Sequence, residues 1–314
     1  MTMTTLISGT TLIFGHKAPD TDSTGSALIW EWFMTHTGVD ACAKLLGTPN
    51  TEAAFVAARW GFDLPDIITD VADGQDCVIV DTNNPAELPA NINGANVTAI
   101  IDHHKLVGGL ETSGPIDITI RPLACTATIM LGLMGDHAAH MPDAIKGLAL
   151  SCIISDTLEF RSPTTTPTDK ALAEVLADDL NIDLHAYATE MFEAKSDVSS
   201  FSDAELLRMD SKEYTVGGTK FRVSVLETTA PKIILDRKDS IMATMTTVAA
   251  EDGVDQVLLF VVDILNEEAT MMIPNALTKT VAEASFGATV TGDMVVLPGV
   301  MSRKKQIIPH LKTA

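Results

Sequence analysis

Cys77-Val-Ile-Val-Asp81 and Val97-Thr-Ala-Ile-Ile-Asp-His-His104 are the two stretches that decide the fold of this chain. Each is a short run of apolar, mostly β-branched residues that ends in polar side chains, and segments with helical periodicity lie around them. Runs of this kind form strands that are buried on both sides, as in parallel sheets covered by helices. We therefore predict an α/β fold whose N-terminal domain has a parallel sheet with helices on both faces.

The rest of the first half fits this pattern. Residues 10–16 are typical of a strand, and residues 23–38 of a helix that Ser23 or Thr24 caps and Gly38 ends. The other predicted elements are a strand at residues 41–46, helices at residues 51–60, 125–134 and 142–154, and two more helices between residues 167 and 194.

A polar stretch, residues 195–204, has few apolar residues. It separates two parts of the chain that differ in their pattern of predicted helices and strands. Beyond it, residues 213–227 predict a hairpin around Gly217-Gly218. A helix at residues 240–250, strands at 256–265 and 269–273 and a helix at 277–285 follow. We predict two domains, residues 1–195 and 203–314, with a linker at about residues 195–203. The second is a smaller α/β domain with a mixed sheet.

The composition excludes several classes of protein. With 314 residues, of which 46% are hydrophobic, the chain can bury one or two cores and is not disordered as a whole. Its formal net charge of −21 argues against nucleic acids and anionic membranes as partners, because both attract cationic surfaces. The longest apolar run, residues 256–266, contains Asp263 and is too short to span a membrane. The first 17 residues lack the basic start and long apolar centre of a signal peptide, so we expect a cytoplasmic protein.

The four cysteines lie far apart, and none belongs to a CxxC pair. We therefore expect reduced, buried packing residues and no zinc site or disulfide. They are Cys42, Cys77, Cys125 and Cys152.

A first polar cluster follows the first predicted strand. His16, Asp20 and Asp22 lie on the turn between this strand and the next helix. An imidazole and two carboxylates can converge on a divalent metal ion. The alternative is that Asp20 or Asp22 only caps the helix.

A second cluster, Asp102-His103-His104, ends a strand. Adjacent residues of an extended segment point to opposite sides, so we expect at most one of the two histidines to face a shared metal. The alternative is a pair of surface histidines.

Asp81 and Asp156 also stand at element ends, where a single aspartate is usually a cap or a solvated charge. Counted together with His16, Asp20, Asp22 and His103, however, they give four carboxylates and two imidazoles in one domain. This set supplies what two divalent cations need, and mixed imidazole and carboxylate ligands suit manganese or cobalt better than magnesium.

The densest basic cluster in this acidic chain lies at residues 298–306. Pro298-Gly299 ends a strand, so that Ser302 can begin a helix. Arg303 offers a planar fork for phosphate oxygens, and Lys304 offers a point charge. The alternative is a solvated helix face, but beside a dinuclear metal site phosphate recognition is the better explanation.

The motifs that carry a family resemblance extend from residue 16 to residue 306. They are His16-x3-Asp20-x-Asp22, Val80-Asp81, Asp102-His103-His104, Ser155-Asp156-Thr157, Phe160-x-Ser162-Pro-Thr-Thr-Thr166 and Ser302-Arg-Lys-Lys-Gln306. Together they resemble the family II, manganese-dependent inorganic pyrophosphatases of the DHH phosphoesterase superfamily. The DHH triplet indicates the superfamily, and the C-terminal SRKKQ segment indicates the pyrophosphatase branch.

The resemblance implies hydrolysis of inorganic pyrophosphate to two orthophosphates by a water that two metal ions activate. The N-terminal domain would carry the metals, and the second domain would close over the substrate. The implied cofactors are two Mn²⁺ or Co²⁺ per subunit, with Mg²⁺ accompanying the substrate. Family members are commonly homodimers, so we expect a homodimer.

The resemblance also implies roles for single residues. One metal would bind His16, Asp20, Asp81 and Asp156, and the other Asp22, Asp81, His103 and Asp156. The residues implied to contact the substrate are His104, Lys212, Ser302, Arg303 and Lys304. Asp102 would orient a histidine. Two positions depart from the family pattern, since Thr82 stands where a histidine is frequent and Glu159 where an apolar residue is common.

Two rival functions remain open at this stage. Another DHH phosphoesterase, an exopolyphosphatase or an oligonucleotide nuclease, is the nearer one. Those that act on nucleic acids commonly carry a GGGH segment, and Gly217-Gly218 has no histidine after it. A manganese-binding scaffold without catalysis is the other, and it leaves the basic segment 303–305 unexplained.

Overall fold

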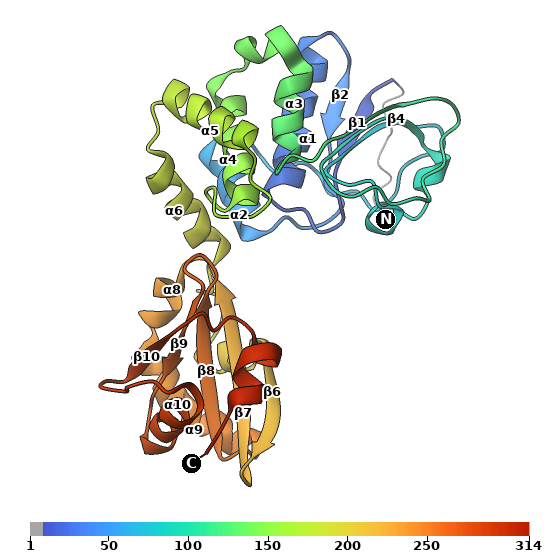
Figure 1. Cartoon of the computed structure of the whole chain (residues 1–314). Helices are drawn as coiled ribbons and strands as arrows, with labels where there is room; N and C mark the ends of the chain where they lie inside the picture. Colours follow the sequence, from blue (N-terminus) through green and yellow to red (C-terminus); the bar gives the residue numbers. More distant parts are fainter. Residues whose placement is uncertain (1–8, 314) are drawn as a thin grey trace. The chain divides into compact units, whose positions relative to one another are not determined.

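The computed structural model describes residues 9–313, and the stretch before residue 9, where we expect no signal peptide, lies outside them. The chain forms two compact units, Met1–Ala194 and Lys195–Ala314 (Figure 1). Among residues 9–313, no helix combines the length and the apolar character that a membrane span requires.

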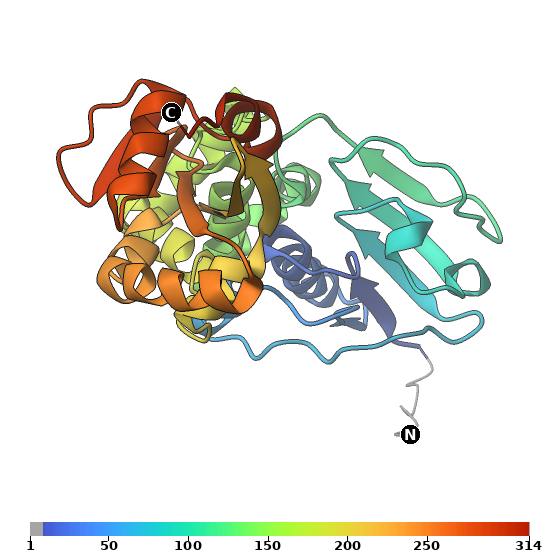
Figure 2. The same ribbon diagram turned by 90° about the horizontal axis from the view of Figure 1, so that it is seen from below.

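The first unit contains a five-stranded sheet in the order β2-β1-β3-β4-β5. All of its strand pairs are parallel, which confirms the predicted parallel α/β architecture. Figure 2 shows these strands, coloured blue to green, beside the helices of the same unit. The strands are β1 (Thr11–Phe14), β2 (Ala41–Ala43), β3 (Asp76–Val80), β4 (Asn96–Asp102) and β5 (Asp117–Ile120). The sequence reading did not include β5, a short edge strand whose residues are exposed or half-buried.

The helices of the first unit are α1 (Thr21–His36), α2 (Thr51–Arg59), α3 (Thr126–Met134), α4 (Asp143–Thr157), α5 (Pro167–Leu180) and α6 (Leu184–Lys195). Helix α1 packs against β1 and β3, and α3 packs against β4. On another face of the strands, Phe14, Cys77 and Ile79 form a core with the connecting segments. The helical residue in this cluster is Ile92, which lies in the short 3-10 turn Ile92–Gly94.

The strand order explains where a site can form. The chain leaves β1 toward β2 on one side, and it returns to β3 on the other side of β1. Ligands bind at such switch points, in the crevice beyond the carboxyl ends of parallel strands. In this unit that position lies between the residues that follow β1 and those that follow β3.

The second unit contains a mixed five-stranded sheet in the order β10-β9-β8-β7-β6. Strands β7 and β8 are parallel and the other pairs are antiparallel, which confirms the predicted mixed sheet. The strands are β6 (Ser211–Val216), β7 (Thr219–Thr228), β8 (Gln256–Asp263), β9 (Glu268–Met272) and β10 (Met294–Pro298). Its helices are α7 (Asp203–Met209), α8 (Pro231–Leu235), α9 (Lys238–Asp252) and α10 (Ala276–Phe286).

Two separate hydrophobic clusters pack helix residues against the second sheet. One contains Leu206 of α7 and Met245 of α9, packed against strand residues such as Leu259. The other contains Val281 of α10 and Ile307 from the C-terminal turn. Every residue of β8 is buried, so β8 is the centre of this unit.

Candidate metal centre

The turn after β1 brings His16 and Asp20 together. Asp20 is the N-cap of α1, and its Oδ1 accepts a hydrogen bond from the backbone N–H of Ser23 (3.0 Å). The prediction that Ser23 or Thr24 caps this helix was wrong, because the helix begins at Thr21. The other oxygen of Asp20 lies 3.7 Å from His16 Nε2. Asp20 therefore caps the helix and also faces His16.

Asp81 lies between two imidazoles. Its Oδ2 is 3.4 Å from His16 Nε2, and its Oδ1 is 3.3 Å from His103 Nε2. The residue follows β3 with a φ of 56°, in the left-handed region that residues other than glycine rarely adopt. Its backbone N–H donates to the carbonyl of Ile101 on β4 (2.9 Å), which fixes this conformation. One carboxylate thus offers one oxygen to each side.

A second group of ligand atoms surrounds His103. Its Nε2 lies 3.7 Å from Asp156 Oδ2 and 4.0 Å from Asp22 Oδ2. The Nδ1 atom of the same ring lies 3.2 Å from the carbonyl oxygen of Leu123, a contact that holds the ring with Nε2 toward the carboxylates. Asp156 lies in the last turn of α4. The structure therefore brings all six residues expected to bind metal into one cluster, His16, Asp20, Asp22, Asp81, His103 and Asp156.

The start of α3 supports this cluster, and sequence reasoning missed it. The backbone N–H groups of Thr126 and Ala127 donate to the Asp22 carboxylate (2.7 and 3.3 Å). The hydroxyl of Thr126 donates to Asp81 Oδ1 (2.9 Å). A helix N-terminus stabilises negative charge, so α3 compensates part of the cost of burying both carboxylates. The only signal in the sequence is a threonine at the second position of the predicted helix at residues 125–134.

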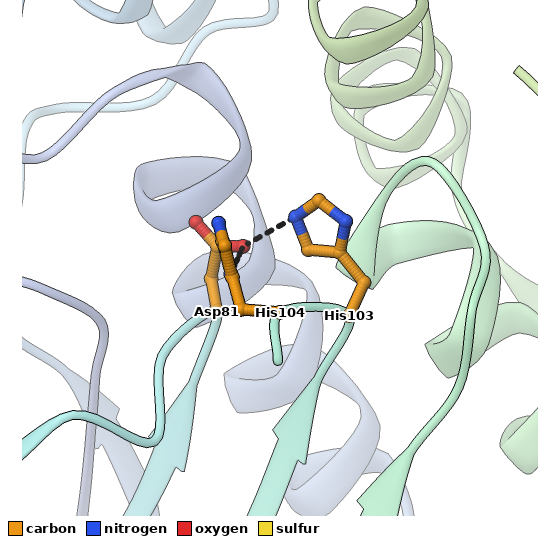
Figure 3. A group of neighbouring side chains, drawn as sticks. All are labelled: Asp81, His103 and His104. Carbon is orange, nitrogen blue, oxygen red and sulfur yellow. Dashed lines mark ion pairs between the residues drawn. The ribbon is translucent and has the colours of Figure 1, made fainter. Parts of the chain in front are cut away.

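His103 and His104 lie on the same side, so the expected alternation of the two side chains was wrong, while the expectation that at most one of them faces a shared metal stays a prediction. Their ring centroids are 4.2 Å apart, and His104 Nδ1 is 3.9 Å from Asp81 Oδ1 (Figure 3). Strand β4 ends at Asp102, and the backbone N–H of His104 turns back to donate to Asp102 Oδ1 (3.0 Å). The alternation of an extended strand therefore no longer applies to these two residues.

Asp102 is fully buried and holds His104. Its Oδ1 lies 2.9 Å from His104 Nδ1, while its Oδ2 accepts a hydrogen bond from Asn83 Nδ2. Asn83 also accepts from the backbone N–H of Val107, so it connects Asp102 to the loop that follows the histidines. Sequence reasoning did not single out Asn83. These contacts leave Asp102 with both oxygens occupied and the exposed His104 with its Nε2 free of this network.

Burial and charge shift the pKa values of the cluster. Burial and the charge of Asp81 raise the pKa of Asp22 to about 7. Burial together with Asp22 and Asp81 also raises the pKa of Asp156 well above its usual value. Burial alone would lower the pKa values of the histidines, but the carboxylates raise that of His16 to about 10 and that of His103 to about 9. The repulsion between the carboxylates thus favours the protonated forms of Asp22 and Asp156, whereas His103 and His16 hold the pKa of Asp81 below its usual value.

The donor set fits divalent transition metals. Three groups of three residues each have ligand atoms within 4.8 Å of one another: His16, Asp20 and Asp81; Asp22, His103 and Asp156; and Asp81, His103 and His104. Ligands about 2.1 Å from one octahedral ion lie about 3 to 4 Å apart, which agrees with the distances given above. Nitrogen and oxygen donors together suit manganese or cobalt.

The two departures from the family pattern have local partners. The Thr82 hydroxyl donates to Glu87 Oε2 (2.7 Å), so the side chain at this position is engaged in its own loop. Glu159 pairs with His185 Nδ1 (2.6 Å) and with Arg161. The partners of Thr82 and Glu159 in these interactions are not among the six candidate metal ligands.

In the second unit, the basic C-terminal turn lies beside the start of β6. Ser302 caps the π-helical turn Arg303–Ile307 by accepting from the backbone N–H of Lys305 (3.3 Å). Arg303 donates to the carbonyl of Asp210 (2.8 Å) and pairs with its carboxylate (2.7 Å). Asp210 directly precedes β6, on which Lys212 is exposed, and Lys304 is also exposed. The structure thus gathers Ser302, Arg303 and Lys304 near the segment that contains Lys212.

Comparison with known proteins identifies both units. The DHH family N-terminal domain matches residues 10–154, and the DHHA2 domain matches residues 189–314. A probable manganese-dependent inorganic pyrophosphatase of Deinococcus radiodurans is 38% identical over 305 residues, covering 96% of this chain and 97% of the relative. One from Staphylococcus aureus is 36% identical, with 97% and 98% covered.

A solved structure agrees with these relatives. The crystal structure of a putative family II inorganic pyrophosphatase from Methanococcus jannaschii matches with a TM-score of 0.59 and 32% identity. The match covers 96% of this chain and 98% of that one. The chain therefore belongs to the family II, manganese-dependent inorganic pyrophosphatases.

Proposed function

We propose that the chain hydrolyses inorganic pyrophosphate to two orthophosphates. Relatives that carry this activity in their names match along nearly its whole length. The observation that carries the proposal is the position of Asp81, whose two oxygens face His16 and His103 at 3.4 and 3.3 Å. A carboxylate in this position can be shared by two cations, which a single-ion site does not require.

The proposed cofactors are two Mn²⁺ per subunit, with Co²⁺ as the alternative and Mg²⁺ accompanying the substrate. The first ion would bind His16, Asp20, Asp81 and Asp156, and the second Asp22, Asp81, His103 and Asp156. When bound, such cations polarise phosphate oxygens and make water a better nucleophile at neutral pH. The six side chains would supply four carboxylates, which offset the charge of the ions in a buried site.

The substrate would be held by His104, Lys212, Ser302, Arg303 and Lys304. Asp102 orients His104, so that its Nε2 can hydrogen-bond a phosphate oxygen. Arg303 has five N–H donors in a rigid fork, and its contacts with Asp210 still leave donors for phosphate. The exposed Lys212 and Lys304 would add charge that favours the transition state.

The domain roles, the assembly and the location belong to the same proposal. Residues 1–195 would bind the metals, and residues 203–314 would bind the substrate and close over it. The family resemblance supports a homodimer in the cytoplasm, and the net charge of −21 supports the absence of nucleic-acid and membrane partners.

Phosphate release from three substrates tests the function. Purified protein with Mn²⁺ is given pyrophosphate, long-chain polyphosphate or a dinucleotide, and Asp81→Ala serves as the inactive control. We expect rapid release from pyrophosphate and little from the other two. Preference for polyphosphate or the dinucleotide would assign the chain to another DHH phosphoesterase activity.

A further inference from the structure

Glu52 is a buried carboxylate near the candidate metal centre that the proposed reaction does not use. It lies in the first turn of α2 with an exposed fraction of 0%. Its Oε2 accepts hydrogen bonds from the hydroxyls of Thr21 (2.9 Å) and Ser155 (2.7 Å). Burying a carboxylate is costly unless it is hydrogen-bonded, so these two donors stabilise Glu52 in its position.

The two hydroxyl donors directly flank candidate metal ligands. Thr21 stands between Asp20 and Asp22 at the start of α1, and Ser155 precedes Asp156 in the last turn of α4. One oxygen atom of Glu52 therefore connects the two helix ends that supply three of the six ligands.

The start of α2 is itself fixed to the ligand-bearing turn. The backbone N–H of Asn50 donates to the carbonyl of Pro19 (3.0 Å), and the Asn50 side chain caps α2 by accepting from Ala53 N (2.8 Å). Gly47 lies shortly before α2 in the chain. A Cβ added to it would lie 2.3 Å from the carbonyl oxygen of Lys17, so the backbone before α2 is in close contact with the turn that contains Lys17. Glu52 thus extends from a backbone that is already held against the turn.

We propose that Glu52 is a positioning residue for the metal pair. By accepting from Thr21 and Ser155 it fixes the separation between the Asp20–Asp22 segment and Asp156, and it thereby sets the affinity of the centre for divalent cations. The inference rests on the proposed function, since it takes the cluster as a metal centre. Residues that orient metal ligands typically change metal affinity about 10- to 100-fold when they are replaced.

Mn²⁺ titration of the metal-free protein tests this role. Thr21→Val and Ser155→Ala each remove one hydroxyl donor, and we expect each to weaken Mn²⁺ binding about tenfold. The matched control is Thr24→Val, because Thr24 is also buried on α1 and its hydroxyl has no hydrogen-bond partner within residues 9–313. This control should bind Mn²⁺ like the wild type.

Two substitutions of Glu52 separate hydrogen bonding from packing. Glu52→Gln keeps an acceptor oxygen, and Glu52→Leu keeps a similar volume without one. We expect Gln to stay within about threefold of the wild-type Mn²⁺ affinity, and Leu to lose tenfold or more and to change the electron paramagnetic resonance spectrum of bound Mn²⁺. Thr21→Val and Ser155→Ala keep the proposal testable if Glu52→Leu does not fold.

The titration distinguishes this inference from the function on which it rests. Unchanged Mn²⁺ affinity and spectrum in Thr21→Val, Ser155→Ala and Glu52→Leu would overturn the positioning role, even if each variant melts at a lower temperature. A wild-type protein that binds Mn²⁺ but releases no phosphate from pyrophosphate would instead overturn the proposed function alone.

Discussion

Replacing Asp102 with asparagine tests how His104 is held for the substrate. Asp102 Oδ1 accepts from the backbone N–H of His104 (3.0 Å) and lies 2.9 Å from its Nδ1, and Oδ2 accepts from Asn83. An asparagine has only one acceptor oxygen, so its NH₂ group must face a donor of His104 or of Asn83. At least one charge-assisted hydrogen bond is lost in either case.

The size of the effect follows from that bond. A hydrogen bond to a charged group contributes about 1.5–3 kcal/mol, and each 1.36 kcal/mol corresponds to tenfold in rate. If the loss acts on the transition state, kcat falls about 10- to 150-fold. The assay is phosphate release from pyrophosphate at saturating Mn²⁺, with manganese content and melting temperature measured on the same samples.

A matched control lies at the other end of the same strands. Asp76 accepts a hydrogen bond from Asn96 Nδ2 (2.6 Å) at the amino ends of β3 and β4. Asp76→Asn should therefore leave kcat unchanged. A kcat within twofold of the wild type for Asp102→Asn would refute the reasoning, and so would a loss of manganese together with activity, because Asp102 would then bind metal itself.

Three further predictions concern the substrate, the packing and the pH dependence of stability. Arg303→Ala should lower kcat about 100-fold or more, since it removes preorganised donors, while inductively coupled plasma analysis finds wild-type manganese content; lower manganese would contradict this division of roles. Gly147→Ala should destabilise the fold by about 1–3 kcal/mol in urea unfolding, because the added Cβ would lie 2.1 Å from the Trp60 ring; unchanged stability would show that the ring moves freely. Burial raises the pKa of Cys77 from 9.0 to about 12. The unfolded thiol therefore ionises first, and its contribution to stability is complete below pH 9 and is lost as the pH rises toward 12. The free energy of unfolding should accordingly fall by up to about 1.4 kcal/mol per pH unit more steeply in the wild type than in Cys77→Ala, and equal slopes would contradict the burial effect.

The meeting of His16, Asp81 and His103 could be predicted from the sequence because each follows an apolar run. Parallel strands place their carboxyl ends at one edge of the sheet, so residues 16, 81 and 103 are expected at the same edge. Their close approach also requires that β1, β3 and β4 are neighbours in the sheet, as the structure shows.

The orientation of His104 could not be predicted in this way. The alternation rule holds only within a strand, and β4 ends at Asp102, whose side chain accepts from His104 and turns the backbone. Strand ends are set by such local hydrogen bonds, which apolar periodicity does not report.

The residues that support the cluster also could not be predicted from the sequence. Thr126 contacts Asp22 and Asp81 only because α3 packs with its first turn against them, and Glu52 contacts Thr21 through the packing of α2. A threonine or a glutamate at the start of a helix normally reflects the preference of these residue types for helix N-termini. Only the tertiary arrangement distinguishes these two from ordinary examples.

The most direct test of the central claim is the number of Mn²⁺ ions that one chain binds. Equilibrium dialysis of the metal-free protein, followed by metal analysis, should give two Mn²⁺ per chain for the wild type. Asp81→Ala should bind fewer than two, because both sites share this carboxylate. One ion or none in the wild type, or two in Asp81→Ala, would contradict a dinuclear centre built around Asp81.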